Sequence, residues 1–343
     1  MKVLVTGSAG FIGFHTVNQF LKHGFEVVGL DNINDYYSPQ LKYARLQEAG
    51  IEQDEIKWYK PVTSTINSKY RFIRMNLEDK QQLFSLFQTE AFDYVVNLAA
   101  QAGVRYSIEN PDVYIQSNIV GFHFLLEACR YFKPTHLVHA SSSSVYGANA
   151  KIPFEEEDKV DAPVSLYAAT KKSNELMAHA YSQLYHISIT CLRFFTVYGP
   201  WGRPDMAPML FAKAISTGKS IQVFNNGEME RDFTYVGDIV NGIFKTTLSE
   251  FTEKPNYRVL NLGNGSPVNL LDFITELERG LNKEALKKFM PMQPGDVPKT
   301  WANQEKLIKI TKYSPDTTLK EGLRRFTEWY NEYYSNGRMD HIA

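Results

Sequence analysis

The segment KVLVTGSAGFIG, residues 2–13, decides the fold of this chain. Its first five residues are predicted to form a short buried strand, and a helical pattern follows the last glycine. Three glycines, Gly7, Gly10 and Gly13, stand at the turn between strand and helix. Glycines at such a turn let the backbone approach a pyrophosphate, which then lies at the positive N-terminus of the helix. The segment therefore predicts a dinucleotide-binding turn.

An acidic residue, Asp31, closes the next predicted strand at residues 26–30. A carboxylate in this place can hydrogen-bond the hydroxyl groups of an adenosine ribose. It would also repel a 2′-phosphate, so the sequence favours NAD over NADP. The alternative to nucleotide binding is that an ordinary glycine-rich turn is followed by an acidic residue by chance. The strand, the glycines, the helix and the acid occur in the order that a nucleotide-binding unit requires, which favours the first interpretation.

Strands and helices alternate through the first 195 residues. Further strands are predicted at 71–76, 94–98, 135–140 and 187–194, and helices at 40–49, 78–88, 114–130 and 165–184. This alternation predicts an α/β protein with a Rossmann-type doubly wound parallel sheet. Residues 50–68 are polar and are predicted to be a surface insertion.

Prolines and glycines between Pro200 and Pro208 predict that the chain leaves the sheet there. We therefore expect a nucleotide-binding domain over residues 1–195. Residues 196–343 are expected to form mainly a smaller C-terminal α/β substrate lobe, with some segments returning to the large sheet. In this part of the chain, a strand is predicted at 221–224 and helices at 211–217, 238–247, 270–281 and 320–333.

Polar side chains with catalytic potential follow the fifth strand. The serine run Ser141–Ser144 begins where that strand ends, and ligands of parallel sheets bind outside the carboxyl ends of the strands. Tyr167 and Lys171 lie one turn apart on one face of the next helix. A lysine ammonium beside a tyrosine hydroxyl stabilises the phenolate, which lets the tyrosine act as a general base or acid near neutral pH. A capped turn and a solvated helix would explain either feature alone, but the combination favours a catalytic site.

Composition argues against several other classes of protein. The net charge is −1, from 37 basic and 38 acidic residues, which disfavours a nucleic-acid-binding surface. The two cysteines, Cys129 and Cys191, and the spacing of the histidines predict neither a disulfide framework nor a metal site, and they suit a reducing, cytoplasmic compartment. No apolar run reaches the length of a membrane span. We therefore expect no metal, no nucleic acid and no membrane partner.

The motifs together resemble the extended short-chain dehydrogenase/reductase superfamily, and within it the nucleotide-sugar 4-epimerases. The resemblance covers nearly the whole chain apart from residues 50–69 and the last few. It rests on the order and spacing of the glycine motif, the serine run before VYG at 145–147, and the Tyr167–Lys171 pair. It implies NAD as the cofactor, in contact with Gly7, Gly10, Phe11, Ile12, Gly13, Asp31, Asn32, Asn76, Leu77, Leu98, Ala99, Ala100, Asn118, Tyr167 and Lys171.

The resemblance also implies a reaction. Tyr167 would remove the proton from the 4-hydroxyl of a UDP-sugar while NAD takes the C4 hydride. The 4-keto sugar would then turn over in the pocket, and the hydride would return to its other face. Ser142 would hydrogen-bond the same oxygen with Ser143 close by, and Lys171 would also hold the nicotinamide ribose. The reaction is redox-neutral overall, so the cofactor is expected to stay bound.

Further positions are assigned to the nucleotide by the same resemblance. Arg231 is implied to bind the diphosphate, which suits the planar fork of arginine, and Asp296 to contact the nucleotide ribose. The sequence departs from the family at two places. Asn76 stands where an aspartate usually faces the adenine, and it can still accept a hydrogen bond through its amide oxygen. Gln293 stands where many sugar epimerases have a second phosphate-binding arginine.

The segment at residues 193–206 resembles the UDP-glucuronate branch of these epimerases, because it has Thr196 and Arg203. A sugar carboxylate suits a hydroxyl donor and a guanidinium, since charge-assisted hydrogen bonds are roughly twice as strong as neutral ones. Once C4 is a ketone, the substrate is a β-keto acid, and an arginine that fixes the carboxylate would restrain loss of carbon dioxide. Arg105 is expected to line the same pocket. The competing interpretation is that Arg203 pairs with Asp205 at the surface.

Other activities stay open at this stage. UDP-glucose and UDP-N-acetylglucosamine are the alternative epimerase substrates. The related 4,6-dehydratases and UDP-glucuronate decarboxylases carry an acidic residue near the positions that Ser143 and Ser144 occupy in this chain. Both activities are therefore disfavoured. A non-catalytic NAD-binding protein is disfavoured by the intact catalytic motif. The resemblance also implies a homodimer joined through two long helices, near residues 112–131 and 165–185.

Overall fold

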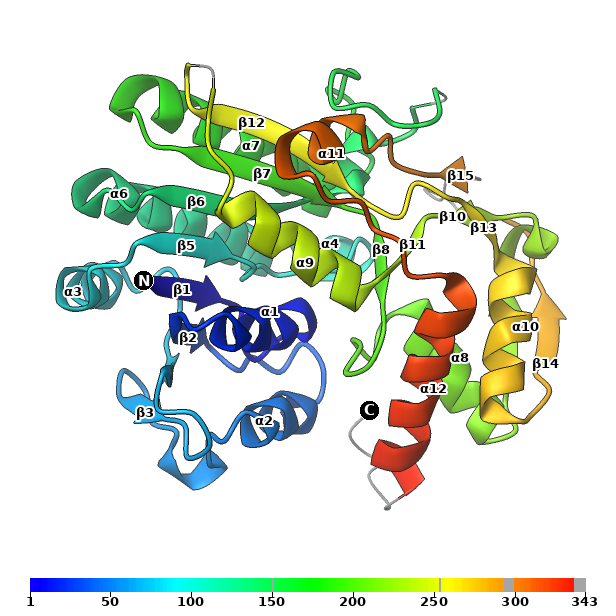
Figure 1. Cartoon of the computed structure of the whole chain (residues 1–343). Coiled ribbons are helices and arrows are strands. Elements are labelled where there is room, and N and C mark those ends of the chain that lie inside the picture. The colour runs from blue at the N-terminus through cyan, green and yellow to red at the C-terminus, as the bar shows by residue number, and fades with distance from the viewer. Residues whose placement is uncertain (150, 253, 293–298, 336–343) are drawn as a thin grey trace.

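The computed structural model of the chain describes residues 1–149, 151–252, 254–292 and 299–335. A large sheet lies at its centre (Figure 1). The strands of this sheet are β1 Lys2–Thr6, β2 Glu26–Asp31, β3 Pro61–Thr63, β4 Tyr70–Arg74, β5 Tyr94–Asn97, β6 His136–Ser142, β7 Ile189–Phe194 and β12 Tyr257–Leu262. They are arranged in the order β12-β7-β6-β5-β1-β2-β4-β3. All neighbours are parallel except β3 and β4.

Helices cover both faces of this sheet. On one face lie α1 Phe11–Lys22, α2 Pro39–Glu48 and α9 Val236–Thr247, and on the other lie α3 Lys80–Glu90, α6 Gly121–Phe132 and α7 Leu166–Tyr185. Alternate side chains of β1 enter two separate cores. Val3 packs in the same core as Phe14 of α1, whereas Leu4 packs in the core that contains Phe122 of α6. The predicted doubly wound α/β fold is therefore confirmed.

A smaller region follows β7. Its helices are α8 Ala207–Ser216, α10 Leu270–Leu281, α11 Glu305–Thr311 and α12 Leu319–Ser335. Two strand pairs lie here: β8 Thr196–Tyr198 pairs with β11 Phe233–Tyr235, and β9 Ser220–Val223 pairs with β14 Leu286–Phe289. A three-stranded sheet is formed by β10 Glu230–Arg231, β13 Val268–Asn269 and β15 Lys299–Thr300. The short remaining elements are α4 Tyr106–Glu109, α5 Pro111–Tyr114, and turns at Gln53–Glu55, Ser143–Tyr146 and Phe224–Gly227. Because α9 and β12 rejoin the large sheet, the domain boundary at residue 195 stays a prediction.

Three features differ from the sequence-based expectation. The insertion at 50–68 contributes β3, which adds an antiparallel edge to the sheet. Strand β12 was not predicted, and it pairs with β7 at the opposite edge. The long helix predicted at 114–130 begins at Pro111 and contains a π-helical stretch, Ile115–Val120. Such widened turns are frequent at functional sites, and this one contains Asn118.

Helix α7 begins where the sequence predicts it. Ser165 precedes the first helical residue, and its hydroxyl accepts a hydrogen bond from the backbone N–H of Ala168 at 3.1 Å. This cap satisfies one of the N–H groups that a helix start leaves unpaired. It sets the position of the first turn, which carries Tyr167.

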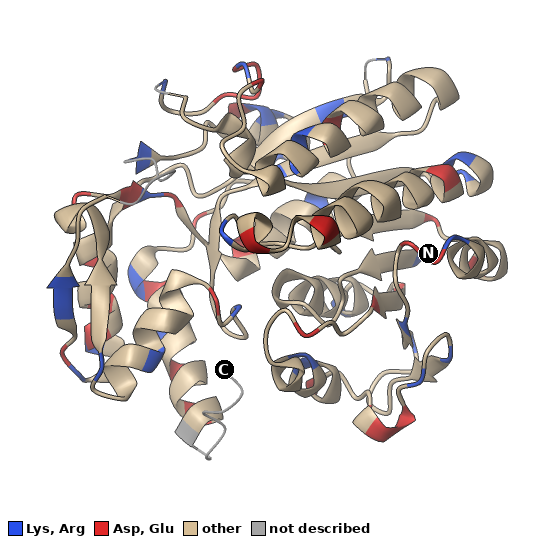
Figure 2. Ribbon diagram, turned by 180° about the vertical axis from the view of Figure 1, so that it is seen from behind, with Lys and Arg blue, Asp and Glu red and all other residues tan. Residues whose placement is uncertain are grey.

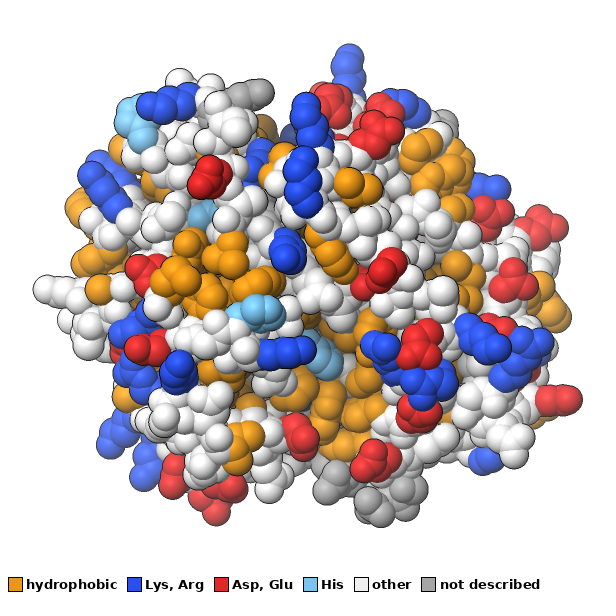
Figure 3. Space-filling model, viewed as in Figure 1, with side chains coloured by type: hydrophobic (Ala, Val, Ile, Leu, Met, Phe, Trp, Pro, Cys, Tyr) orange, Lys and Arg blue, Asp and Glu red, His pale blue; other side chains and the backbone are white. Residues whose placement is uncertain are grey.

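The surface gives two further observations. Among the described residues, no helix combines the length and apolar character needed to cross a membrane. Figure 3 shows basic and acidic side chains interspersed over the face seen in Figure 1. That face therefore has no broad field of a single sign, in agreement with the nearly neutral net charge.

Candidate active site

A cavity of about 860 Å³ lies at the carboxyl ends of the central strands, between the sheet and the smaller region. The structure brings nearly all the site residues predicted from the sequence to its wall. From the cofactor set these are Gly7, Gly10, Phe11, Ile12, Gly13, Asp31, Asn32, Asn76, Leu77, Leu98, Ala99, Ala100, Tyr167 and Lys171. From the substrate set they are Arg105, Ser142, Ser143, Thr196, Arg203 and Arg231. Asp296 and Gln293 lie outside the described residues.

The glycine turn forms a tight cradle. Gly7 has φ +69°, and a Cβ atom there would lie 2.8 Å from the backbone nitrogen of Ala99. A Cβ at Gly13 would lie 2.0 Å from the carbonyl oxygen of Gly7. Any side chain at these two positions would therefore displace the backbone of the turn. The close approach fits a phosphate-binding turn at the N-terminus of α1.

Asp31 connects this turn to the end of β2. Its carboxylate accepts hydrogen bonds from the backbone N–H of Ala9 at 3.2 Å and of Ile33 at 2.8 Å. Asn32 donates to the amide oxygen of Asn76 at 3.2 Å. The acid and the two amides thus form one polar edge of the cavity, which fits an adenosine ribose and base. The residues present therefore fit a bound NAD.

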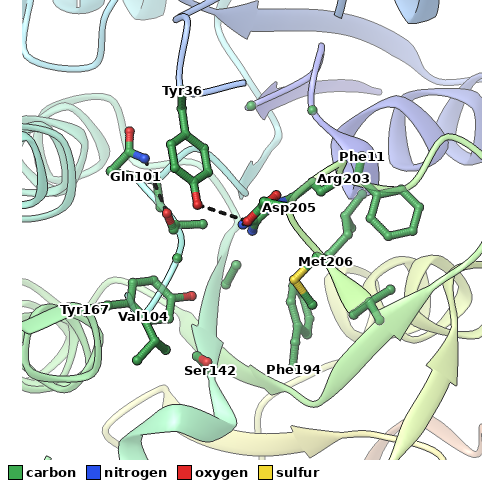
Figure 4. Close-up of a pocket in the computed structure, with 18 of the residues that line it drawn as sticks. Phe11, Tyr36, Gln101, Val104, Ser142, Tyr167, Phe194, Arg203, Asp205 and Met206 are labelled. Carbon is green, nitrogen blue, oxygen red and sulfur yellow. Dashed lines mark hydrogen bonds and ion pairs between the residues drawn. The ribbon is translucent and has the colours of Figure 1, made fainter. Parts of the chain in front are cut away.

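Tyr167 and Ser142 face each other on one side of the cavity (Figure 4). Burial raises the pKa of Tyr167, and a hydrogen bond with Ser142 and the charge of Arg203 act in the opposite direction. Ser142 also donates from its hydroxyl to the hydroxyl of Ser144 at 3.0 Å. The phenol is therefore mainly protonated at neutral pH, and positive charge in the cavity makes its ionisation easier.

The position of Lys171 differs from the simple ion-pair expectation. Its ammonium donates to the carbonyl oxygen of Ala140 at 2.9 Å and lies 5.9 Å from the centre of the Tyr167 ring. Burial lowers the pKa of Lys171 to about 8, so the group is mostly charged at neutral pH. Lys171 is therefore fixed by the end of β6, and the direct contact with the Tyr167 hydroxyl inferred from helix spacing is not formed.

Asn118 does not line the cavity, although the sequence places it in the cofactor set. It is 2% exposed, and its amide bonds both backbone groups of Gln101, at 2.8 Å to the nitrogen and 3.0 Å to the oxygen. It also donates to the hydroxyl of Thr170 at 3.1 Å. The π-helical stretch thus places Asn118 behind the wall, where it joins the segment after β5 to the helix that carries Tyr167.

Arg203 forms the opposite side of the cavity. Its Nε donates to Asp205 at 3.0 Å, and a second bond from Nη2 completes a bidentate pair. The hydroxyl of Tyr36 also donates to Asp205, at 2.9 Å (Figure 4). The pairing raised as the competing interpretation therefore exists, but it lies in the cavity wall with Arg203 only 22% exposed. Burial raises the pKa of Asp205, and the charge and hydrogen bonds of Arg203 more than offset this effect.

Several residues of the wall were missed by the sequence analysis. They include Tyr36, Gln101, Met206 and Phe224. Tyr36 meets Asp205 across 169 residues of sequence, so no local pattern could have indicated the contact. Among the described residues, no cluster of three or more His, Cys, Asp or Glu side chains is arranged to hold a metal ion.

Comparisons with known proteins agree with this geometry. The profile of the NAD dependent epimerase/dehydratase family matches residues 3–263. Protein CapI of Staphylococcus aureus is 50% identical over 350 residues, which covers 97% of this chain and 99% of CapI. UDP-glucuronate 4-epimerase 4 of Arabidopsis thaliana is 46% identical over 353 residues, which covers 98% of this chain and 76% of the plant protein. A crystal structure of UDP-glucuronic acid 4-epimerase from Bacillus cereus, in complex with UDP-glucuronic acid and NAD, has a TM-score of 0.86 at 35% identity, over 97% of this chain and 100% of that one.

Proposed function

The chain belongs to the NAD dependent epimerase/dehydratase family, and we propose that it interconverts UDP-glucuronate and UDP-galacturonate by epimerisation at C4. Its cofactor is NAD, which supplies a reversible hydride acceptor for C4. The observation that carries the substrate assignment is Arg203, a guanidinium in the cavity wall across from Tyr167 and Ser142. Relatives named for this activity support the proposal.

The residues of the cavity divide the chemistry between them. Tyr167 accepts the proton of the sugar 4-hydroxyl as C4 is oxidised, and returns a proton to that oxygen when C4 is reduced on its other face. Ser142 hydrogen-bonds the same oxygen, with Ser143 beside it in the wall. Lys171, held by Ala140, provides a fixed positive charge that favours the phenolate and is placed to hold the nicotinamide ribose. Proton and hydride both return, so the reaction is redox-neutral.

Recognition of the sugar carboxylate is assigned to Arg203 and Thr196. Asp205 takes the Nε hydrogen and one Nη2 hydrogen of Arg203, so the guanidinium has further N–H donors that Asp205 does not use. The Thr196 hydroxyl at the start of β8 offers a second donor on the same wall. Two donors fixed on this wall would keep the carboxylate out of line with the C4 ketone and so restrain decarboxylation. Arg231, implied to bind the diphosphate, and Arg105, expected in the same pocket as Arg203, also line the cavity.

An uncharged UDP-sugar is the second candidate substrate. The observation that favours it is the Asp205 carboxylate, which neutralises Arg203 before any substrate arrives. A glucuronate carboxylate would add a second negative charge beside that pair. UDP-glucose and UDP-N-acetylglucosamine avoid this repulsion, so they are the comparison substrates in the test.

We expect the wild-type protein to turn over UDP-glucuronate with a higher kcat/KM than UDP-glucose or UDP-N-acetylglucosamine. Arg203→Met should lower kcat/KM for UDP-glucuronate by about 10- to 100-fold, the loss typical of a hydrogen bond to a charged group, and leave the uncharged sugars less affected. Proton NMR of the product would identify galacturonate, a pentose from decarboxylation, or a dehydrated sugar.

Arg279→Met is the matched control, because Arg279 is 69% exposed in a surface pair with Glu276 and is not one of the residues that line the cavity. It should behave as the wild type. Preference of the wild type for an uncharged sugar, or unchanged glucuronate turnover in Arg203→Met, would contradict the substrate assignment.

We also propose that two chains associate through the face formed by the α5–α6 run and α7. Figure 2 views the molecule from behind and shows these helices side by side with few charged residues. Large apolar side chains are exposed on them, with Ile115 at 42%, Leu176 at 60% and Leu184 at 66%. Exposed apolar patches of this kind mark protein interfaces in soluble proteins. This is the helix pair expected from the sequence.

Size-exclusion chromatography with light scattering should show a dimer, with twice the chain mass of 39.3 kDa. The double change Leu176→Glu with Leu184→Glu places charges on the face and should yield monomers. Leu248→Glu changes a leucine that is 40% exposed beyond the end of α9, and it should leave the dimer intact. A monomeric wild-type protein, or a double variant that stays dimeric, would contradict the proposed interface.

A further inference from the structure

Arg45 on α2 is a fully buried arginine that the function proposed above does not use. Its side chain is 0% exposed, and its hydrogen-bond partners are neutral oxygen atoms. Nη1 donates to the carbonyl of Ala9 at 3.0 Å and to the hydroxyl of Tyr37 at 2.8 Å. Nη2 donates to the carbonyl of Trp201 at 2.7 Å and, more weakly, to that of Gly202 at 3.4 Å.

The charge of Arg45 is not balanced by an ion pair with any carboxylate in the described part of the chain. Its Nε is buried and also lacks a hydrogen-bond partner there. A buried charge without a counter-charge is costly, so such a residue is not expected for packing alone. A leucine or methionine would fill the space without this cost.

The hydrogen-bond partners of Arg45 belong to two segments of the proposed site. Ala9 belongs to the glycine turn at the N-terminus of α1, on which a pyrophosphate would be held. Trp201 and Gly202 directly precede Arg203, the residue assigned to the sugar carboxylate. One guanidinium group thus bonds the cofactor turn and the substrate segment at the same time.

The segment that Arg45 holds has an unfavourable backbone conformation. Trp201 has φ +61°, in the left-handed region that a bulky residue rarely adopts. Its ring is wedged between Phe14 of α1, at 5.6 Å, and Tyr333 of α12, at 4.8 Å between ring centres. Conformations of this kind persist only where the surroundings enforce them, and they are frequent at binding sites.

A second, half-buried side chain holds the same segment. His15 of α1 lies with Nε2 2.9 Å from the carbonyl oxygen of Pro200. Because a carbonyl can only accept, Nε2 carries the hydrogen and donates. Burial lowers the pKa of His15 to about 4, so the ring is neutral at physiological pH and this bond does not depend on protonation. Two side chains of the nucleotide-binding domain therefore fix residues 200–202.

We propose that Arg45 is a positioning residue that couples the NAD-binding turn to the segment carrying Arg203, so that cofactor retention and sugar recognition both depend on it. Its positive charge lies behind the turn at Ala9 and supports the pyrophosphate of bound NAD. Its bonds to Trp201 and Gly202 hold the strained backbone that presents Arg203. The second part of this inference rests on the proposed function, and the first part does not.

The first experiment measures NAD released by denaturing the purified protein. Arg45→Met should retain less than half of the NAD that the wild type retains, and Arg45→Lys, which keeps the charge, should retain more than Arg45→Met. Arg258→Met is the matched control. Arg258 likewise bonds neutral oxygen atoms, at 2.9 Å to Thr190 and 2.9 Å to the carbonyl of Glu250, but it lies on β12 away from the cavity wall.

Equal loss of NAD in Arg45→Met and Arg258→Met would show a general packing defect and would overturn the proposal. Full NAD retention in Arg45→Met would overturn it as well. If Arg45→Met fails to fold, Arg45→Lys decides the question: its NAD content must fall between that of a fully loaded wild type and an empty protein while its unfolding temperature matches that of Arg258→Met. Wild-type NAD content in Arg45→Lys would then refute a role for the Arg45 guanidinium in holding NAD.

The second experiment tests the coupling to Arg203 with NAD added at saturation. The kcat/KM for the best UDP-sugar is measured for Arg45→Met, Arg203→Met and the double variant. If Arg45 acts through Arg203, the double variant should equal Arg203→Met within about twofold, because interacting residues are not additive. A kcat/KM of the double variant that falls by the product of the two single-variant losses would overturn the coupling. Failure of the substrate proposal appears separately, as a wild type that prefers an uncharged sugar, and it leaves the NAD measurement unaffected.

Discussion

Tyr167→Phe is expected to keep the fold and the bound NAD while losing about 10²- to 10⁴-fold in kcat, the contribution typical of general acid–base catalysis. The change removes one hydroxyl from a half-buried side chain on the first turn of α7 and leaves the ring in place. Neither the cap at Ser165 nor the bond from Lys171 to Ala140 involves that hydroxyl. Turnover should therefore fall without loss of stability.

The measurement is the initial rate of product formation at saturating UDP-sugar, beside the NAD content and the unfolding temperature of the same preparation. Tyr185→Phe is the matched control, since it makes the same change at the last residue of the same helix. It should retain normal turnover. Near-normal turnover in Tyr167→Phe would remove Tyr167 from the proton transfer, and loss of NAD together with turnover would mean that its role is structural.

The contribution of Arg203 to this chemistry was not foreseen. Its charge eases the ionisation of Tyr167, while Lys171 is held away from the phenol by Ala140. The group assigned to the sugar carboxylate thus also influences the base. A sugar carboxylate that approaches Arg203 would partly neutralise this effect, so the Asp205 pair and the substrate together set the charge that Tyr167 experiences.

Local sequence patterns predicted the nucleotide-binding half well, because its signals are local. The strand before Gly7, the helix after Gly13 and the acid at Asp31 all lie within one βα unit. The helix with Tyr167 and Lys171 has its own cap and its own period. Such features require no knowledge of distant contacts, and each of them stands in the structure where it was expected.

Contacts between distant segments could not be predicted. Asn118 was assigned to the cofactor because of its position in a motif, but a π-helical stretch turns its amide toward Gln101 and Thr170. Arg45 bonds the carbonyl oxygen of Trp201 across 156 positions of sequence. The backbone irregularities that create these contacts have no recognisable local signal. They are also the features that connect the two parts of the cavity.

Behind the cavity, Glu175 and Arg193 form a buried ion pair that supports the end of β6. Each side chain is 2% exposed. The guanidinium bonds both carboxylate oxygens, at 2.9 Å each, and Ser141 donates to the same carboxylate at 2.7 Å. The pair therefore joins α7, one turn after Lys171, to β7, and the bond from Ser141 ties the end of β6 to the same carboxylate. Its hydrogen bonds are complete, which is the condition under which a buried pair is tolerated.

Arg193→Met should lower the free energy of unfolding by about 3–5 kcal/mol, because it leaves the Glu175 carboxylate buried without its counter-charge. Urea unfolding followed by far-UV circular dichroism would measure this as a lower midpoint. Adding Glu175→Leu to Arg193→Met removes the stranded charge and should recover much of the loss. Arg279→Met, which breaks an exposed pair, should change the free energy by about 1 kcal/mol or less. If Arg193→Met is as stable as this control, or if the double variant is less stable than Arg193→Met, the stranded Glu175 charge is not the cause of the expected loss in free energy of unfolding.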